Sequence, residues 1–350
     1  MDKHFWNGKK VFITGHTGFK GAWLAFVLRL FGAEVTGFAL EPPTEPNLFS
    51  LIELRKIINS VNGDVRELAT LKKFFDKCEP EIVFHLAAQP IVLEGYRNPV
   101  VTYETNVLGT VNILECVRQN PCVKSFLNVT TDKVYQNNEW AWGYRETDTL
   151  NGRDPYSNSK SCSEIVTDCY RQSFFSDSDV AISTARAGNV IGGGDFADFR
   201  IIPDCVRAAL AGEKISVRNP RSVRPYQHVL EPLFAYMMIA EAQYRDKKFS
   251  GCYNVGPAEN DCVTTGELVD IFCKAWGEGL SWQSLSVEFP PESNFLKLDC
   301  SKIKSVFGWS PRWNVSRAVD KTVEWTKIYR QHGNLAECMK NQIENFLGEI

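Results

Sequence analysis

The sequence has no long apolar run, no block of basic residues and no closely spaced pair of cysteines. Its 39 basic and 42 acidic side chains give a formal net charge of −3 over 350 residues, which argues against a nucleic-acid-binding protein. The apolar stretch 24–35 is interrupted by Arg29 and Glu34, so it lacks the roughly 18 uninterrupted apolar residues of a membrane-spanning helix. The first residues are charged and lead directly into a strand-like segment, so we expect no signal peptide and a cytoplasmic protein.

The eleven cysteines are scattered along the chain and never form a C-x-x-C pair. The closest pairs are Cys116 with Cys122 and Cys162 with Cys169. Structural zinc sites use ligands at tight spacing, and the chain has only five histidines. We therefore expect reduced thiols and no metal site.

Strand-like and helical segments alternate over the first half of the chain. Short apolar runs lie at 10–14, 35–40, 82–86, 125–129 and 181–186, and helical periodicity at 22–31, 68–77, 101–119 and 157–175. A strand, a helix and a strand within about 30 residues require a parallel crossover. The alternation predicts an α/β fold, namely a Rossmann-like doubly wound parallel sheet with helices on both faces.

The alternation stops after Asn189, where a glycine-rich turn at 192–195 precedes short polar segments. We expect residues 1–190 to form a dinucleotide-binding Rossmann domain, to which a segment at about 228–258 returns. Residues 191–227 and 259–350 are expected to form a smaller C-terminal lobe that binds the substrate at the carboxyl edge of the sheet.

Three glycines follow the first strand and precede the first helix. Gly15, Gly18 and Gly21 allow a tight turn, a close approach of backbone N–H groups to a pyrophosphate, and contact with the positive end of the helix dipole. Their spacing, G-x-x-G-x-x-G, is typical of short-chain dehydrogenases. A plain strand-to-helix turn is the alternative interpretation.

The end of the second strand bears on the choice between NAD and NADP. The acid that would hold the ribose hydroxyls is missing there, and Glu41 comes one or two places late. No arginine or lysine lies nearby in the sequence, which disfavours a 2′-phosphate, so we predict NAD. Asp64 and Val65, after a turn at 62–63, fit an adenine contact and a plain surface turn equally well.

A catalytic pair is predicted at the start of the helix near residue 157. Asp154 is a suitable N-cap and Pro155 a suitable first helical residue. Tyr156 and Lys160 then lie on one helix face, four residues apart. A neighbouring ammonium stabilises a phenolate, so we expect the pKa of Tyr156 to fall toward neutrality, which would make it a usable base.

The residues Thr131, Asp132 and Lys133 follow a buried strand, at the sheet edge where open α/β folds place their chemistry. A hydroxyl alone would serve a dehydrogenase or an epimerase. An acid and an amine beside it indicate a second proton transfer, and therefore an elimination. The alternative is that the polar residues cap the strand and that Lys133 is solvated.

Several motifs together resemble one family. They are GHTGFKG at 15–21, HLAAQP at 85–90, TDK at 131–133, YSNSK at 156–160 and RAGNVIGGGD at 186–195. Over about residues 6–330 the chain resembles the extended short-chain dehydrogenase/reductases, and within them the CDP-glucose 4,6-dehydratases. The lysine of the triplet, RNP at 218–220 and RPYQHVLEP at 224–232 carry that closer similarity, whereas dTDP-glucose and GDP-mannose dehydratases usually have an acid in place of the lysine.

The sequence departs from the pattern of those dehydratases at a few positions. Tyr226 and Phe196 stand where we expect tryptophan, and Asn151 where we expect glycine. Residues 198–201 differ from an expected Asp-Arg-Leu run. These departures leave the nucleobase and the sugar open but do not touch the proton-transfer groups.

The resemblance implies a lyase with tightly held NAD that converts CDP-glucose to CDP-4-keto-6-deoxyglucose in deoxysugar biosynthesis for lipopolysaccharide O-antigen. The implied catalytic residues are Thr131, Asp132, Lys133, Tyr156 and Lys160. The implied cofactor-binding residues are Gly15, Thr17, Gly18, Phe19, Lys20, Gly21, Asp64, Val65, Leu86, Ala87, Ala88, Asn106, Thr130, Tyr156 and Lys160. The implied substrate-binding residues are Gln89, Asn189, Arg200, Arg218, Arg224 and His228.

The resemblance also implies roles for these groups. Tyr156 would take the proton of the C4 hydroxyl, which Thr131 orients, and Asp132 would protonate the departing C6 hydroxyl. Lys133 would remove the C5 proton or stabilise the enolate electrostatically. Arginine forks suit the diphosphate of a nucleotide sugar, and relatives lead us to expect a homodimer or homotetramer.

Two other functions remain open from the sequence. A nucleotide-sugar 4-epimerase, or a 4,6-dehydratase for a different nucleoside diphosphate hexose, would share the glycine turn and the Tyr156/Lys160 pair. An epimerase would not need Asp132 and Lys133. A dinucleotide-sensing protein without catalysis would typically lack Tyr156 or Lys160, and both are present.

Overall fold

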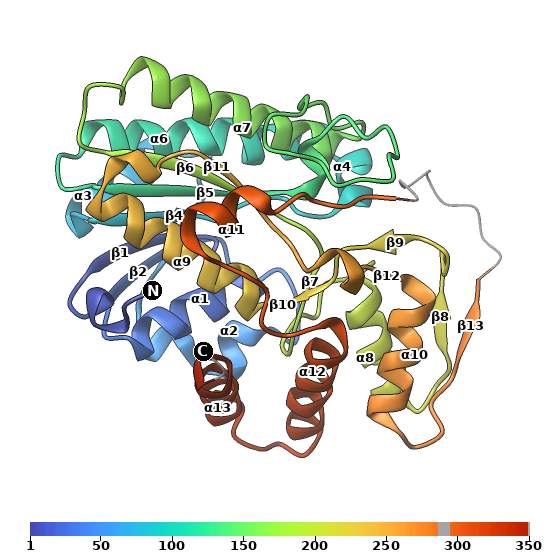
Figure 1. Cartoon of the computed structure of the whole chain (residues 1–350). Coiled ribbons are helices and arrows are strands. Elements are labelled where there is room, and N and C mark those ends of the chain that lie inside the picture. The colour runs from blue at the N-terminus through green and yellow to red at the C-terminus, as the bar shows by residue number, and fades with distance from the viewer. Residues whose placement is uncertain (286–294, 349–350) are drawn as a thin grey trace.

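The computed structural model describes residues 1–285 and 295–348. Its centre is a seven-stranded sheet with the strand order β11-β6-β5-β4-β1-β2-β3, in which every neighbouring pair is parallel (Figure 1). The strands are β1 (Lys10–Thr14), β2 (Glu34–Ala39), β3 (Asn59–Asn62), β4 (Ile82–His85), β5 (Ser125–Thr131), β6 (Ala181–Ala187) and β11 (Cys252–Val255). The predicted doubly wound parallel sheet is therefore confirmed.

Helices cover both faces of this sheet. One face packs against α1 (Phe19–Leu30) and α9 (Leu230–Arg245), and the other against α3 (Leu68–Cys78), α6 (Gly109–Gln119) and α7 (Pro155–Ser173). Consecutive side chains of β1 serve the two layers in turn: Val11 and Ile13 lie in the cluster with α1, and Phe12 in the cluster with α3. The sequence of a strand that is buried on both faces is therefore a continuous apolar run.

The helix predicted over 101–119 contains an irregular turn. It consists of α5 (Pro99–Tyr103), a π-helical turn (Glu104–Leu108) and α6. A π-turn inserts an extra residue per turn and is frequent at functional sites. Here it carries the buried Asn106.

A second hydrophobic cluster lies beside the carboxyl edge of the sheet, on the right in Figure 1. Its main elements are α8 (Ile201–Ala211), β8 (Ile215–Val217), α10 (Thr265–Trp276) and β13 (Trp282–Ser284). Small two-stranded ladders join it to the sheet domain: β7 (Val190–Ile191) with β10 (Gln227–His228), and β9 (Val223–Arg224) with β12 (Val263–Thr264).

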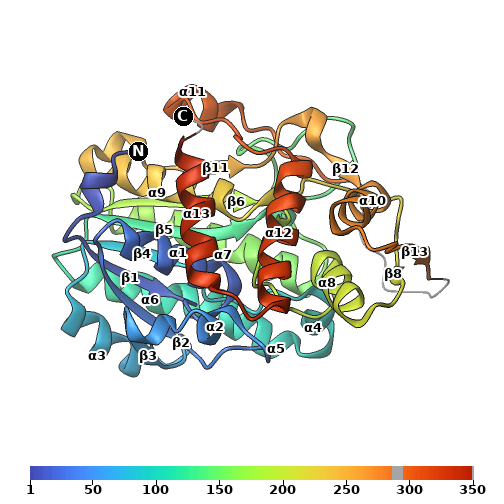
Figure 2. The same cartoon turned by 90° about the horizontal axis from the view of Figure 1, so that it is seen from below.

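The last helices belong to different clusters. From α12 (Val315–Arg330), Val315, Val319 and Val323 pack in the second cluster, whereas Trp325 packs in the core of the sheet domain. All the buried apolar residues of α13 (Leu335–Gly348) lie in that core, together with residues of α1 and α9, and Figure 2 shows α13 on that side. The predicted division of the chain into two domains stays a prediction, and part of it lies outside the described residues. It assigns residues 1–190 and 228–258 to one domain, and residues 191–227 and 259–350 to the other.

Within the described residues, no helix is long and apolar enough to cross a membrane. All eleven cysteines are free thiols. The described part of the chain contains no group of three or more His, Cys, Asp or Glu side chains that could hold a metal ion.

Candidate active site

The glycine turn between β1 and α1 forms a tight cradle at the carboxyl edge of the sheet. Gly15 has a φ of 79°, and a Cβ there would lie 2.7 Å from the backbone nitrogen of Ala87. A Cβ on Gly21 would lie 2.1 Å from the carbonyl oxygen of Gly15. No side chain caps α1 at Gly18, and its first turn contains no acid. The turn therefore fits a pyrophosphate, which would meet backbone N–H groups and the positive end of a twelve-residue helix.

The end of β2 differs from the sequence prediction. Thr17 donates from its hydroxyl to the carbonyl oxygen of Leu40 at 2.9 Å, which ties the glycine turn to this strand end. Glu41 accepts from Arg55 at 3.2 Å and from Asn62 at 2.8 Å. The expectation that no basic residue lies near was wrong, because the chain returns after β2 and brings Arg55 against Glu41.

Two other predicted cofactor contacts follow β3. Asp64 forms an ion pair with Arg66 at 2.6 Å, and Arg66 also reaches Glu104 on the π-turn at 3.2 Å. Val65 is buried. Asp64 thus has a partner within the protein, and its contact with adenine stays a prediction.

The loop after β4 is fixed from both sides. The backbone N–H groups of Leu86 and Ala87 donate to the hydroxyl of Thr14, each at 3.1 Å. Asn106 accepts from the backbone of Gln89 at 2.8 Å and donates to the hydroxyl of Ser159 at 2.8 Å. The side chain of Asn106 therefore links this loop to α7.

Gln89 uses both ends of its side-chain amide inside the protein. Its Nε2 donates to Thr102 at 2.9 Å, and its Oε1 accepts from the backbone of Ile91 at 2.6 Å. The side chain therefore shapes the loop, and substrate binding by Gln89 stays a prediction.

The start of α7 is as the sequence predicted. Asp154 is the N-cap and accepts from the backbone N–H of Ser157 at 3.0 Å, and Pro155 is the first helical residue. Tyr156 and Lys160 are 9% and 4% exposed, so the pair lies inside the protein rather than on its surface.

The predicted shift of the tyrosine was wrong in direction. Burial raises the pKa of Tyr156 to about 12; Asp132 and Asp154 add to this effect, and Thr131 and Arg200 oppose it. Lys160 is not among the main groups that shift this pKa, and its Nζ donates to the carbonyl oxygen of Val129 at 3.0 Å.

Lys160 is itself shifted. Burial lowers its pKa to about 8, and the nearby carboxylate of Glu164 opposes this decrease. The ammonium therefore carries its charge at neutral pH but loses it in mildly alkaline solution.

The predicted triplet lies at the end of β5. The hydroxyl of Thr131 donates to Asp132 Oδ1 at 3.0 Å and also lowers the pKa of the neighbouring Tyr156. Asp132 is fully buried, and its Oδ2 has no hydrogen-bond partner. Lys133 Nζ lies 3.5 Å from Asp132 Oδ1 and 3.5 Å from Asn189 Oδ1. The structure thus brings a phenol, a hydroxyl, a carboxyl and an amine together at one sheet edge.

Two charged groups from other elements face this cluster. Arg200, the N-cap of α8, forms an ion pair with the buried Asp195 at 3.0 Å. Burial, together with Arg200 and Lys160, lowers the pKa of Lys20 on α1 to about 7, and Asp132 and Asp195 oppose this. Asp195 was not predicted, although it ends the glycine cluster at 192–194.

The remaining predicted substrate contacts are two arginines and a histidine. Arg218 lies 3.5 Å from Asp204 and against the ring of Phe199, and Arg224 is buried on β9. Both stay predictions. His228 also stays a prediction. Its ring is fully buried between Trp23 and Trp313, with centroid distances of 6.1 and 4.9 Å, and its Nδ1 accepts from the backbone of Leu230.

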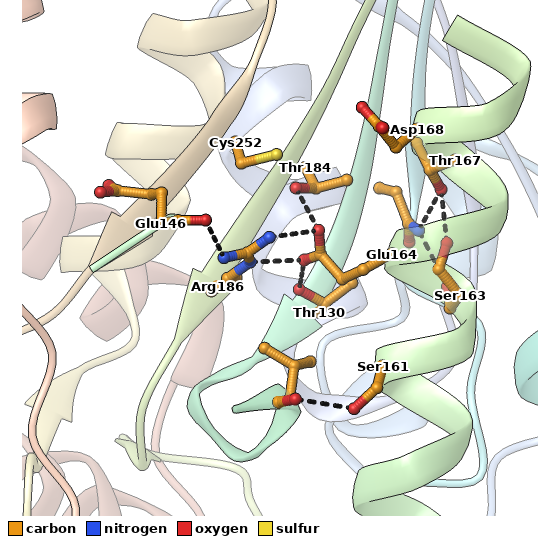
Figure 3. A network of polar contacts seen from close by, with 12 residues as sticks. Thr130, Glu146, Ser161, Ser163, Glu164, Thr167, Asp168, Thr184, Arg186 and Cys252 are labelled. Atoms are coloured by element: carbon orange, nitrogen blue, oxygen red, sulfur yellow. Dashed lines mark hydrogen bonds and ion pairs between the residues drawn. The ribbon is translucent and has the colours of Figure 1, made fainter. Parts of the chain in front are cut away.

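A buried network lies behind the catalytic residues (Figure 3). Arg186 on β6 and Glu164 on α7 form a two-bond ion pair, with both distances 3.0 Å. The hydroxyl of Thr130 donates to Glu164, so the side chain of this predicted cofactor contact points into the network. The sequence prediction missed Glu164 and Arg186; the only signal was the position of Glu164, four residues after Lys160.

The family of the protein follows from the match to a family model. The model described as GDP-mannose 4,6 dehydratase matches residues 12–322. The chain belongs to this family. The resemblance to the extended short-chain dehydrogenase/reductases is thereby confirmed.

Relatives of this GDP-mannose 4,6 dehydratase family member include characterised enzymes. The CDP-glucose 4,6-dehydratase of Salmonella typhimurium is 44% identical over 353 residues, which cover 99% of this chain and 98% of the relative. A dTDP-glucose 4,6-dehydratase of Xanthomonas campestris is 26% identical, over 89% of this chain and 92% of the relative.

Solved structures share the fold. The UDP-glucose 4-epimerase of Thermotoga maritima with UDP-glucose has a TM-score of 0.78 at 22% identity, over 91% of this chain and 99% of that one. The dTDP-glucose 4,6-dehydratase of Bacillus anthracis in complex with NAD has a TM-score of 0.76 at 21% identity, over 93% and 99%. At this identity the similarity shows the α/β fold alone.

Proposed function

We propose that the protein converts CDP-glucose to CDP-4-keto-6-deoxyglucose and water, with NAD as a cofactor that is reduced and regenerated in each turnover. The observation that carries the proposal is the contact of Thr131 with both Tyr156 and Asp132. The 44% identical relative named for this activity supports it. The solved dehydratase with NAD and the glycine cradle support the choice of cofactor.

The protein's own groups would divide the chemistry as follows. Tyr156 accepts the proton of the C4 hydroxyl, and Thr131 orients that hydroxyl. Lys160 would hold the nicotinamide ribose. NAD, when bound, would supply the hydride acceptor for C4 and the hydride donor for C6.

The second half of the reaction needs an acid and a base. We assign to Asp132 the protonation of the leaving C6 hydroxyl, and the buried Oδ2, which has no hydrogen-bond partner among the described residues, supports this role. Lys133 lies beside it and removes the C5 proton or stabilises the enolate.

Substrate binding is proposed for residues along the border of the second cluster. Arg218 and Arg224 would bind the diphosphate or the nucleoside, and Asn189 and Arg200 the hexose. Arg200 is placed for this by its ion pair with Asp195. Gln89 contributes through the loop that it shapes.

The direct test is to incubate the purified protein with a panel of nucleoside diphosphate hexoses. Loss of one water mass and a ketone absorbance in alkali with CDP-glucose are expected. An isomer of unchanged mass would show a 4-epimerase instead. Preference for another nucleotide would reassign the substrate, and no turnover of any sugar would reject the proposal.

An exposed apolar face supports a homo-oligomer. Tyr103, Leu108, Ile165 and Phe174 are between 37% and 55% exposed on the outer sides of the π-turn region and α7. We propose that this face forms the contact in a homodimer, or in the dimer of a homotetramer, of a cytoplasmic enzyme of O-antigen deoxysugar synthesis. Light scattering coupled to gel filtration measures the oligomeric state, and charged substitutions at Leu108 and Ile165 are expected to give monomers.

A further inference from the structure

Three consecutive residues at the end of β5 each interact with a different residue of α7, the first two through hydrogen bonds. The pairs are Val129 with Lys160, Thr130 with Glu164, and Thr131 with Tyr156. The second of these pairs contains no group that the proposed reaction uses. It joins the catalytic end of the strand to a helix position one turn beyond Lys160.

Glu164 is held in turn by Arg186 on β6. Both side chains are 2% exposed. The guanidinium donates from Nε to Glu164 Oε1 and from Nη2 to Oε2, each at 3.0 Å, and Thr184 donates to Oε2 at 2.7 Å. Figure 3 shows this carboxylate surrounded by donors from both strands. Each of its oxygens therefore accepts two bonds.

The far side of the guanidinium extends the same network. Arg186 Nη1 donates to the hydroxyl of Tyr135 at 2.8 Å and to the carbonyl oxygen of Glu146 at 3.1 Å. Tyr135 donates to Asn254 on β11 at 2.6 Å. The pair thus fixes the segment that leaves the catalytic triplet as well as the strand that enters it.

Stability alone does not account for such a pair. Two charges lose their hydration when they are buried, and well-packed apolar residues of similar volume often give equal or greater stability. A buried, fully bonded fork defines instead one relative position of the elements that it joins.

The pair also affects the electrostatics of the site. Lys160 interacts with His85 on β4, Lys20 on α1 and Glu164 on its own helix. Burial keeps the imidazole of His85 neutral, since it lowers its pKa to about 3, and Lys20 is a base. Of these three groups, Glu164 is the acid, and its carboxylate favours the charged form of Lys160.

We propose that Glu164 and Arg186 form a positioning unit of the active site, which fixes the end of β5 against α7 and supplies the negative charge that faces Lys160. The proposal rests on the proposed function, because it takes Lys160 as part of the working site. Neither residue touches the substrate.

The test compares Glu164→Gln with the double variant Glu164→Gln/Arg186→Met. The single variant leaves the guanidinium of Arg186 buried without its partner. The double variant removes both charges, so the titration of Lys160 can still be measured if the single variant does not fold. Two quantities are measured against pH: the dehydration rate with CDP-glucose, and the ¹³Cε resonance of Lys160, assigned with Lys160→Arg. In Glu164→Gln the titration of Lys160, and the pH at which the rate levels off, are expected to move to lower pH by about one unit. The double variant also loses the positive charge of Arg186, so its shift is expected to have the same direction and to be smaller.

Gln243→Met is the matched control. Gln243 is also buried and joins β5 and β6 through Ser125 and Ser183, but at the amino ends of the strands. This variant is expected to lose stability and to keep the wild-type pH profile. Wild-type titration of Lys160 in a folded double variant overturns the positioning unit, whereas a wild-type protein that does not dehydrate CDP-glucose overturns the proposed function instead.

Discussion

The hydroxyl of Thr131 donates to Asp132 Oδ1 at 3.0 Å and interacts with the phenol of Tyr156, whose pKa it lowers. One hydroxyl thus connects the proposed base for the C4 proton with the proposed acid for the C6 hydroxyl. Both proton transfers occur on the same hexose, at carbons two bonds apart. A single short strand end can therefore serve oxidation and elimination without a large movement of the sugar.

Tyr156→Phe tests the first transfer. Loss of the phenolic base is expected to lower the dehydration rate by about 10²- to 10⁴-fold while CDP binding, measured by calorimetry, stays unchanged. In the wild type the rate should rise with pH up to about 8 and then level off, because the ionised fraction of Tyr156, whose pKa burial raises to about 12, still grows while Lys160, with a pKa of about 8, loses its charge. Tyr170→Phe is the control, since this tyrosine lies at the other end of α7 and bonds to Glu115.

Lys133→Gln tests the second transfer. If Lys133 is the base, the variant should still pass hydride to the cofactor but lose exchange of the C5 proton in D₂O. Transient absorbance of reduced cofactor and mass spectrometry of the recovered sugar measure the two steps separately. Full C5 exchange in the variant would exclude Lys133 as the base and leave it the electrostatic role.

Glu41→Ala tests cofactor selectivity at the end of β2. The variant removes the carboxylate that pairs with Arg55 at 3.2 Å, so the guanidinium becomes available to a 2′-phosphate. Binding of NADP is expected to strengthen and binding of NAD to weaken, each by roughly tenfold, as one charge-assisted bond would give. Calorimetric titration with both dinucleotides measures this, and Glu53→Ala, which breaks an exposed pair with Lys56, is expected to change neither.

Glu231→Gln tests a buried carboxyl outside the site. Burial raises the pKa of Glu231 to about 7, although its Oε1 accepts from the backbone of Arg312 and Trp313. A folded-state pKa above the unfolded one means that stability falls as pH rises from about 4.5 to about 7, by on the order of 3 kcal/mol. The variant should lose this pH dependence in thermal unfolding. Glu344→Gln, on the exposed side of α13, should retain it.

Hydrophobic periodicity located the strands that are buried on both faces, because burial is what the pattern records. It missed β3, whose sequence Asn-Ser-Val-Asn is polar since the strand lies at the sheet edge. The N-cap at Asp154 and the helix face shared by Tyr156 and Lys160 could also be predicted, because capping and helical spacing depend on neighbouring residues.

What the sequence could not reveal depends on contacts between distant segments. The approach of Arg55 to Glu41 needs the path of the chain after β2. The burial that raises the pKa of Tyr156 depends on the packing of α7 against distant segments, and the bond of Lys160 to the backbone of Val129 needs the distance between helix and strand. His228 followed a motif, but only the packing of two tryptophan rings shows that it is enclosed.

The position of α13 has a consequence for how the chain folds during synthesis. Phe346 stacks on Phe234 with ring centroids 5.0 Å apart and meets Trp313 at 5.1 Å, inside the core that also holds Trp23 of the first helix. A nascent chain therefore cannot close this core until α13 has left the ribosomal exit tunnel. The dinucleotide domain is thus completed by a helix that is synthesised after all seven of its strands.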